Sequence, residues 1–317
     1  MLSMTITDLF INRAGRLRSG WRLALFLAIT QVLIELTVLL IPAALGLVLG
    51  SADRASALLA GPLGYVMQAL VILAAAALTG WWCGRVFEGL PPRALGWALH
   101  RGWWGDLLVG SLIGAGSIGL AVLIGAAGGG FRLHLGPGGP SVVRTLVVSA
   151  GVFTLAAAAE ETLFRGYPLQ TLLRSLPAWI AVALPSALFA LVHLANPHVV
   201  PGFTFVNTTL AGIWMAVAYI RSRSLWLPLG LHWAWNWTQG ALLGLPVSGI
   251  TTLAPAPLMR ALDTGPAWLT GGAYGIEGGA ACTIALMISI AFVWLARFIS
   301  ATEEMKQFTS NMTDARP

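Results

Sequence analysis

Long apolar stretches dominate the hydrophobic pattern of the chain. A membrane-spanning helix needs about 20 mainly apolar residues, and several stretches meet or approach that length. Their approximate limits are 23–49, 58–82, 107–126, 143–165, 178–195, 203–220, 226–244 and 279–299. Polar residues interrupt the stretches between 143 and 244, whereas the first two and the last are cleaner. The pattern predicts an all-α, polytopic transmembrane helical bundle with about eight spans.

Composition and charge agree with the membrane class and suggest an orientation. Charged residues make up 9% of the chain, against roughly 25% in an ordinary soluble domain. With a cytoplasmic N-terminus, 14 of the 18 Lys and Arg residues fall on the inner side. The other four are Arg54, Arg132, Arg144 and Arg260. This positive-inside bias predicts that both termini are cytoplasmic. It also explains the net charge of +6, so we expect membrane lipids and no nucleic acid as partners.

The polar interruptions suggest where the functional part of the chain lies. We interpret residues 1–106 as an N-terminal lead-in, with two spans and a cytoplasmic loop, and 300–317 as a polar tail. Residues 107–299 would form the core and the last span, with the informative motifs within 140–245. The stretches 125–141 and 241–275 are predicted to be loops.

Three clusters of polar side chains fall inside predicted spans. An ionisable residue at the centre of a membrane helix costs roughly 2.5–3.5 kcal/mol on insertion scales, so it is by default a candidate functional residue. The clusters lie in EETLFRG, in FALVHLANP and in GLHWAWNWTQG, and their members are Glu160, Glu161, Arg165, His193, His232 and Asn236.

Helical spacing makes each cluster coherent. Glu161 and Arg165 are separated by four residues, acid first, which favours an ion pair along one helix face. Glu160 is turned about 100° from Glu161, so it can point elsewhere. A turn at 175–177 would make the fourth and fifth spans an antiparallel hairpin. Glu160 and His193 would then both lie about 24 Å from that turn, although Pro168 is expected to kink or restart the helix.

The clusters can therefore converge in one pocket, which we expect in the cytoplasmic half of the membrane. Glu160 with His193 could hold and deprotonate a water molecule. His232 and Asn236 could donate hydrogen bonds to a developing oxyanion. Such a set could hydrolyse an amide bond without a nucleophilic Ser or Cys. The same carboxylate and imidazoles could instead ligate one divalent metal ion, since Glu and His are zinc ligands.

The three motifs also carry a family resemblance. EETLFR matches EExxxR, FALVH matches FxxxH, and HWAWN matches HxxxN, in this order over about 77 residues. The chain resembles the CPBP family of CAAX-protease-like and bacteriocin-processing intramembrane endopeptidases, also called the Abi family. The close resemblance covers about 140–245, and its flanking residues are similar to those of bacterial members. It implies a multi-pass protein of the bacterial inner (plasma) membrane.

The resemblance implies a role for each matched residue. Glu160 would be the general base, assisted by His193, while His232 and Asn236 would stabilise the oxyanion. Glu161 and Arg165 would be supporting residues that contact substrate or fix the helix. Substrates would be membrane-associated or prenylated peptides or proteins. No cofactor would be required. Zinc is the alternative, held by Glu160, His193 and His232.

Two other functional classes stay open on the sequence. One is a non-catalytic membrane module that binds a peptide or bacteriocin and confers immunity. The other is a proton-coupled transporter, whose Glu and His relay would have similar residues. An uncharged Asn236 beside His232 favours an oxyanion site over a proton relay.

Overall fold

The computed structural model describes residues 6–12 and 15–310, and helices dominate it. Each predicted span corresponds to a helix. These helices are α2 (Ser19–Leu49), α4 (Pro62–Glu88), α5 (Trp103–Ala127), α6 (Gly139–Glu161), α8 (Ala178–His193), α9 (Pro201–Ser222), α10 (Trp226–Trp237) and α12 (Ala280–Leu295). Within the described residues, five helical segments are long and apolar enough to cross a membrane, and α8 and α12 are shorter apolar helices. The prediction of an all-α, multi-pass bundle is confirmed.

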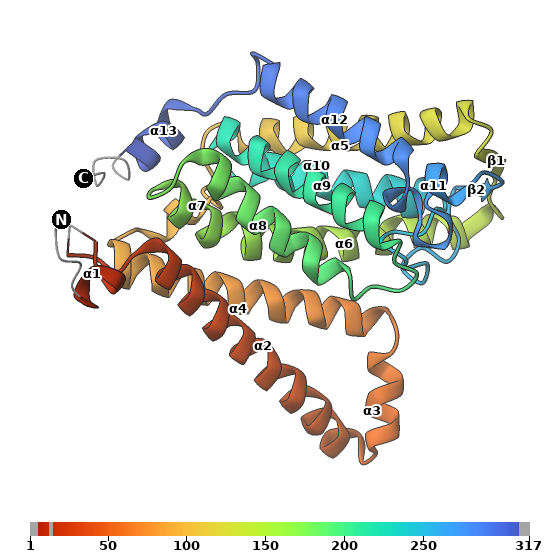
Figure 1. The fold of residues 1–317 in the computed structure, drawn as a ribbon. Coiled ribbons are helices and arrows are strands. Elements are labelled where there is room, and N and C mark those ends of the chain that lie inside the picture. The colour runs from red at the N-terminus through yellow and green to blue at the C-terminus, as the bar shows by residue number, and fades with distance from the viewer. Residues whose placement is uncertain (1–5, 13–14, 311–317) are drawn as a thin grey trace.

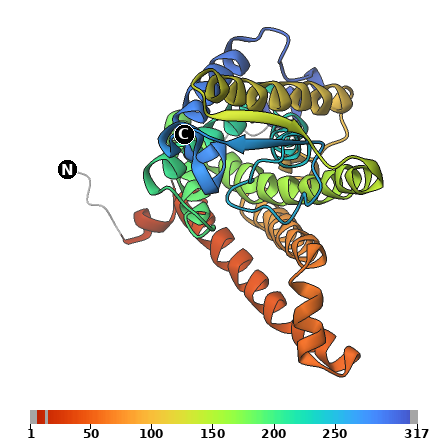
Figure 2. The same ribbon diagram turned by 90° about the vertical axis from the view of Figure 1, so that its right-hand side faces the viewer.

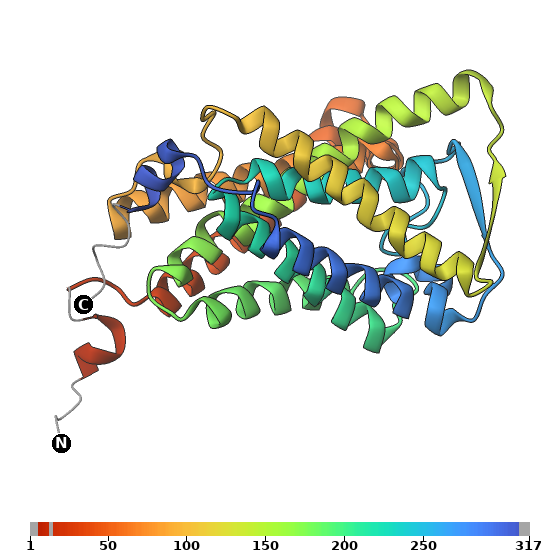
Figure 3. The ribbon, with the colours of Figure 1, turned by 90° about the horizontal axis from the view of Figure 1, so that it is seen from above.

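The short elements define the two ends of the bundle. α1 (Ile6–Phe10) and α13 (Glu303–Ser310) lie at the same end of the bundle (Figures 1 and 3). Because the first and last described helices share one end, this placement agrees with an even number of spans. The opposite end carries α11 (Ala267–Thr270) and the 3₁₀ turns Gly272–Tyr274 and Ile276–Gly278. A further 3₁₀ turn, Pro92–Leu95, lies between α4 and α5.

Both predicted loops contain a strand. β1 (Phe131–Leu135) and β2 (Met259–Asp263) pair antiparallel, with Phe131 opposite Asp263 and Leu135 opposite Met259. The ribbon crosses the end of the bundle away from α1 and α13 (Figure 2). β1 joins α5 to α6, and β2 lies within the long segment between α10 and α12. The ribbon therefore ties that segment to the bundle.

The first span departs from the bundle along its length. α2 lies close to α4 near its N-terminal end, then diverges from it, and α3 (Ala52–Leu59) returns the chain to α4 (Figure 1). At the close end, Glu88 of α4 accepts hydrogen bonds from Arg22 at 2.6 Å and from Arg174 at 2.7 and 2.8 Å. This buried ion-pair cluster fastens α2, α4 and the segment after α7 to one another.

Glycines bring α5 and α10 into backbone contact. A Cβ atom built on Gly114 would lie 2.3 Å from the carbonyl oxygen of Leu231, and one on Gly110 would lie 2.3 Å from that of Leu227. Gly230 of α10 approaches Leu107 of α5 in the same way. Small residues are typical of such close helix contacts in membranes. The contact holds α10, which carries His232 and Asn236, against the bundle.

Gly114→Ala is therefore expected to destabilise the protein by roughly 1–3 kcal/mol, because the added methyl overpacks a backbone contact. Gly116, two residues away on the same helix, has no heavy atom within 4 Å of a built Cβ. Gly116→Ala is the matched control and should leave the apparent melting temperature in detergent unchanged. Equal melting temperatures for the two variants would contradict this account of the α5–α10 contact.

Candidate active site

The first motif lies where the fourth span changes its helical geometry. α6 ends at Glu161, a π-helical turn covers Thr162–Gly166, and α7 (Tyr167–Leu173) follows with Pro168 in its first turn. Proline has no N–H to donate to the preceding turn, and the wider π turn accommodates this break. The expected restart at Pro168 is confirmed. Such π turns often occur at functional sites, and this one directly follows Glu160 and Glu161.

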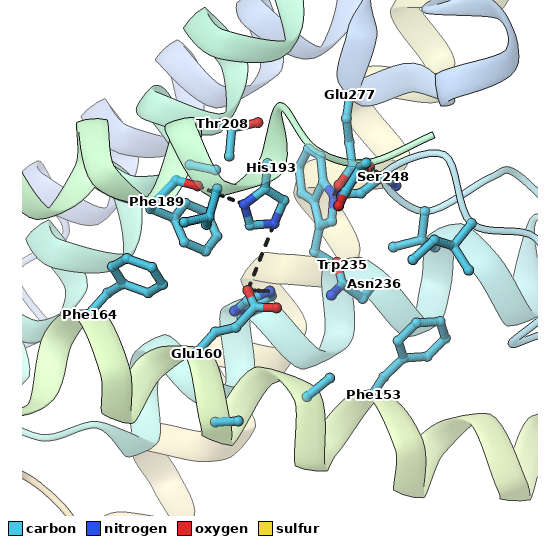
Figure 4. A pocket seen from close by; sticks show the side chains of 18 of the residues that line it. Phe153, Glu160, Phe164, Phe189, His193, Thr208, Trp235, Asn236, Ser248 and Glu277 are labelled. Carbon is cyan, nitrogen blue, oxygen red and sulfur yellow. Dashed lines mark hydrogen bonds and ion pairs between the residues drawn. The ribbon is translucent and has the colours of Figure 1, made fainter. Parts of the chain in front are cut away.

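The side chain of Glu160 faces two imidazole rings from two other helices. Its Oε2 atom lies 3.6 Å from Nε2 of His232 and 4.0 Å from Nε2 of His193 (Figure 4). The Glu160 side chain is 31% exposed, although its Oε2 atom is itself buried and has no hydrogen-bond partner among the described residues. His193 is the last residue of α8 and His232 lies in α10. The three motifs therefore converge, as the helical spacing predicted.

Hydrogen bonds orient both rings. Nδ1 of His193 lies 2.7 Å from the carbonyl oxygen of Phe189, and Nδ1 of His232 lies 2.9 Å from Oε1 of Glu161. Both partners only accept hydrogen bonds, so Nδ1–H is the donor in each ring. Nε2 of each ring is then turned toward Glu160. In a neutral ring Nε2 is an acceptor, as is the carboxylate of Glu160. A water molecule or a proton between them would therefore stabilise the arrangement.

Glu161 and Arg165 lie behind this cluster and do not face the cavity. Nη1 of Arg165 donates to Oε1 of Glu161 at 3.1 Å, as the four-residue spacing predicted, and both side chains are fully buried. Nη2 of Arg165 donates to the carbonyl oxygen of Gly212 in α9, and its guanidinium lies 4.5 Å from the ring centre of Phe189. Oε1 of Glu161 thus accepts hydrogen bonds from both Arg165 and His232.

Acidic and basic side chains surround the ring of His232. Its Nδ1 atom lies 2.9 Å from Oε1 of Glu161, which also accepts from Arg165, and its Nε2 atom lies 3.6 Å from Oε2 of Glu160. The ring of His232 is thus held between the two carboxylates.

A cavity of about 460 Å³ opens in front of Glu160, His193, His232 and Asn236. Figure 4 shows the side chains of Glu160 and His193 pointing toward each other, with Asn236 to one side of them. The predicted lead-in also contributes walls, through residues of α2 and α4 such as Tyr65. A carboxylate, two imidazoles and a carboxamide thus line the same cavity.

Comparison with known proteins agrees with this arrangement. Residues 142–238 match the family model described as type II CAAX prenyl endopeptidase Rce1-like. This segment is Rce1-like. No curated protein and no solved structure matches the chain.

The Rce1-like segment contains all six residues of the three motifs, which confirms the resemblance seen in the sequence. At the family level it indicates a CAAX-type intramembrane endopeptidase. The match covers about a third of the chain, from early α6 to the start of the π turn Thr238–Leu242. It assigns no role to individual residues.

The cavity of the Rce1-like segment extends in an unexpected direction. We expected a site near the cytoplasmic boundary, on the side of the termini. The lining beyond the catalytic candidates instead includes Asn196, Ser248 and Glu277, which lie in connections at the end opposite α1 and α13. The cavity therefore runs from Glu160 toward that opposite end, because the connection between α10 and α12 folds over it.

Sequence reasoning missed Glu277, which lies outside the Rce1-like segment but lines the same cavity. It belongs to the 3₁₀ turn Ile276–Gly278 directly before α12. The only signal in the sequence was one carboxylate in the glycine-rich stretch GIEGG, next to a predicted span. No motif included it, and its contacts come from distant parts of the chain.

A metal ion at this site would be held by Glu160, His193 and His232. A carboxylate with two imidazoles is a donor set that zinc accepts. The spacing fits less well, because no group of three or more His, Cys, Asp or Glu side chains within residues 6–12 and 15–310 is arranged to hold a metal ion. We therefore derive no step through a metal.

Proposed function

We propose that the protein is an intramembrane endopeptidase that hydrolyses peptide bonds in membrane-associated or lipidated peptides or proteins. The observation that supports this most is the approach of Glu160 Oε2 to Nε2 of His193 and of His232 beside an open cavity. The Rce1-like match makes a CAAX-type substrate, with its prenylated C-terminus, the first to test. The apolar helices support a multi-pass membrane protein, and the uneven distribution of arginine supports cytoplasmic termini.

In the first step, Glu160 would act as the general base. Its carboxylate removes a proton from a water molecule held between it and Nε2 of His193, and the hydroxide attacks the carbonyl carbon of the peptide bond. The Phe189 carbonyl keeps the Nδ1 proton of His193 in place. Nε2 of His193 can therefore accept a hydrogen bond from the attacking water.

In the second step, the negative charge on the carbonyl oxygen would be stabilised by His232 and Asn236. Protonated His232 donates through Nε2, while Glu161 holds its Nδ1–H. The carboxamide of Asn236, one helical turn further along α10, supplies the second donor. Glu160 then passes the proton it took from water to the leaving amine, the C–N bond breaks, and the carboxylate is regenerated.

Asn236→Ala is expected to lower kcat by roughly 10²-fold, because one oxyanion donor is removed. KM and the apparent melting temperature should change little, since Asn236 lines the cavity and the substitution leaves a small side chain there. Steady-state kinetics on a cleaved peptide would measure this. A rise in KM at constant kcat would instead show that Asn236 contributes to ground-state binding.

The proposal is tested by assaying the purified protein in neutral detergent against a pool of quenched-fluorescent peptides that includes farnesylated CAAX peptides. Cleavage that persists with a chelator supports the glutamate mechanism, in which no cofactor is required. Cleavage that is lost with chelator and restored by zinc would support the metal alternative. Absence of cleavage would favour the peptide- or bacteriocin-binding module, and proton flux in vesicles would favour the transporter.

A further inference from the structure

Hydrogen bonds hold the backbone of Glu277 beside the cavity of the candidate active site. Nδ2 of Asn207 donates to the carbonyl oxygens of Glu277 and Gly279 at 2.8 and 2.9 Å. Oδ1 of the same Asn207 accepts from Thr283 of α12 at 2.6 Å. α9 and α12 thus both fix the turn that carries Glu277, and its half-buried side chain lines the cavity (Figure 4).

Neutral groups from two segments organise the carboxylate of Glu277. Oε1 accepts from Nε1 of Trp235 at 3.2 Å. Oε2 accepts from Nε2 of Gln239 at 3.1 Å and from the backbone N–H and hydroxyl of Ser248 at 2.6 and 3.2 Å. These donors fix the orientation of the Glu277 carboxylate, and none of the four contacts brings a cationic group to it.

The other acidic side chains that the structure shows to be buried or half-buried differ from Glu277 in this respect. Glu88 pairs with Arg22 and Arg174, Glu161 with Arg165, and Asp106 with His100, while Glu160 faces two histidines. Glu277 has no Lys, Arg or His nitrogen within 4.0 Å in the part of the chain that the structure describes. Its charge is thus available to a cation that enters the cavity.

We propose that Glu277 determines specificity by binding a cationic group of the substrate peptide, such as a lysine or arginine side chain near the scissile bond. This inference rests on the proposed endopeptidase function. Trp235, which donates to Glu277, directly precedes Asn236 and lies three residues after His232. A peptide whose carbonyl oxygen lies at His232 and Asn236 would therefore have a neighbouring side chain close to Glu277.

The same hydrogen bonds also hold the turn around Ser248, whose φ is 48°. A variant at Glu277 would thus affect every peptide equally if its role were only to hold this turn. Glu277→Gln separates the two roles, because it removes the charge but retains a carbonyl oxygen as an acceptor. Ser248→Ala is the matched control, since it removes one hydrogen bond to Glu277 and keeps the charge.

The test measures binding in a background in which cleavage is strongly slowed. Fluorescein-labelled, farnesylated peptides of neutral sequence would carry one lysine at successive positions, with norleucine at the same positions as reference. Their binding to Glu160→Gln protein in neutral detergent would be followed by fluorescence anisotropy. At one position we expect lysine to bind roughly tenfold more tightly than norleucine, a value between those of exposed and buried ion pairs.

Adding Glu277→Gln should abolish this lysine preference and leave the norleucine peptides nearly unchanged, whereas adding Ser248→Ala should preserve it. The inference would be overturned if Glu277→Gln weakened the binding of all peptides equally, or if lysine were preferred at no position. The wild-type cleavage assay separates the two proposals. A lysine preference in a protein that cleaves nothing would show that Glu277 binds a cationic group of the peptide, but it would overturn both the endopeptidase function and a role of Glu277 in substrate specificity.

Discussion

Glu160→Gln is expected to lower kcat by roughly 10²–10⁴-fold, the usual contribution of a general base. The amide has almost the same shape as the carboxylate, so it fills the same space between His193 and His232, but it cannot take a proton from water. Because the Glu160 side chain is 31% exposed, the loss of its charge should leave the apparent melting temperature unchanged. Steady-state and single-turnover kinetics on one cleaved peptide would measure the effect.

The matched control for this variant is Glu35→Gln, which neutralises an exposed carboxylate on α2 that accepts a hydrogen bond from Gln31 of the same helix. It should cleave at the wild-type rate. If Glu160→Gln retained wild-type kcat, Glu160 would lose its assigned role, whatever the control showed.

Arg165→Met is expected to destabilise the protein by about 3–5 kcal/mol, because removal of one partner leaves the buried Glu161 without its cation. The substitution also removes the hydrogen bond to Gly212 and the contact with the Phe189 ring. The readout is the apparent melting temperature in detergent. Arg144→Met, on the exposed surface of α6, is the control and should have no effect.

The double variant Glu161→Gln/Arg165→Met distinguishes charge from packing. Neutralising both partners removes the isolated charge, so part of the lost stability should return. Activity should stay low, because Glu161 also holds Nδ1–H of His232. An Arg165→Met protein as stable as wild type would contradict the buried ion pair.

Much of the fold could be predicted because membrane spans depend on local composition. Apolar length alone located the helices. Counting residues along the hairpin placed Glu160 beside His193, and the structure places them 4.0 Å apart. The pair Glu161–Arg165 followed from the four-residue spacing. These inferences succeeded because helix geometry converts sequence distance into spatial distance within one hairpin.

Contacts between distant segments could not be obtained in this way. Glu161 binds His232 across 71 residues, and no helical period relates them. The carboxylate of Glu277 is organised by Ser248, 29 residues away, in a connection without a strong pattern. The β1–β2 ribbon was missed because its short strands lie in glycine-rich and proline-rich sequence. The direction of the cavity depends on this same folded connection.

In the proposed mechanism, Glu160 activates water and does not itself attack the peptide. The direct test is a single turnover in ¹⁸O-labelled water, followed by mass spectrometry of the product and of the peptide that contains Glu160. We predict one ¹⁸O atom in the new carboxyl terminus of the product and none in the Glu160 side chain. Label in Glu160 would show a covalent anhydride intermediate and would contradict the general-base mechanism.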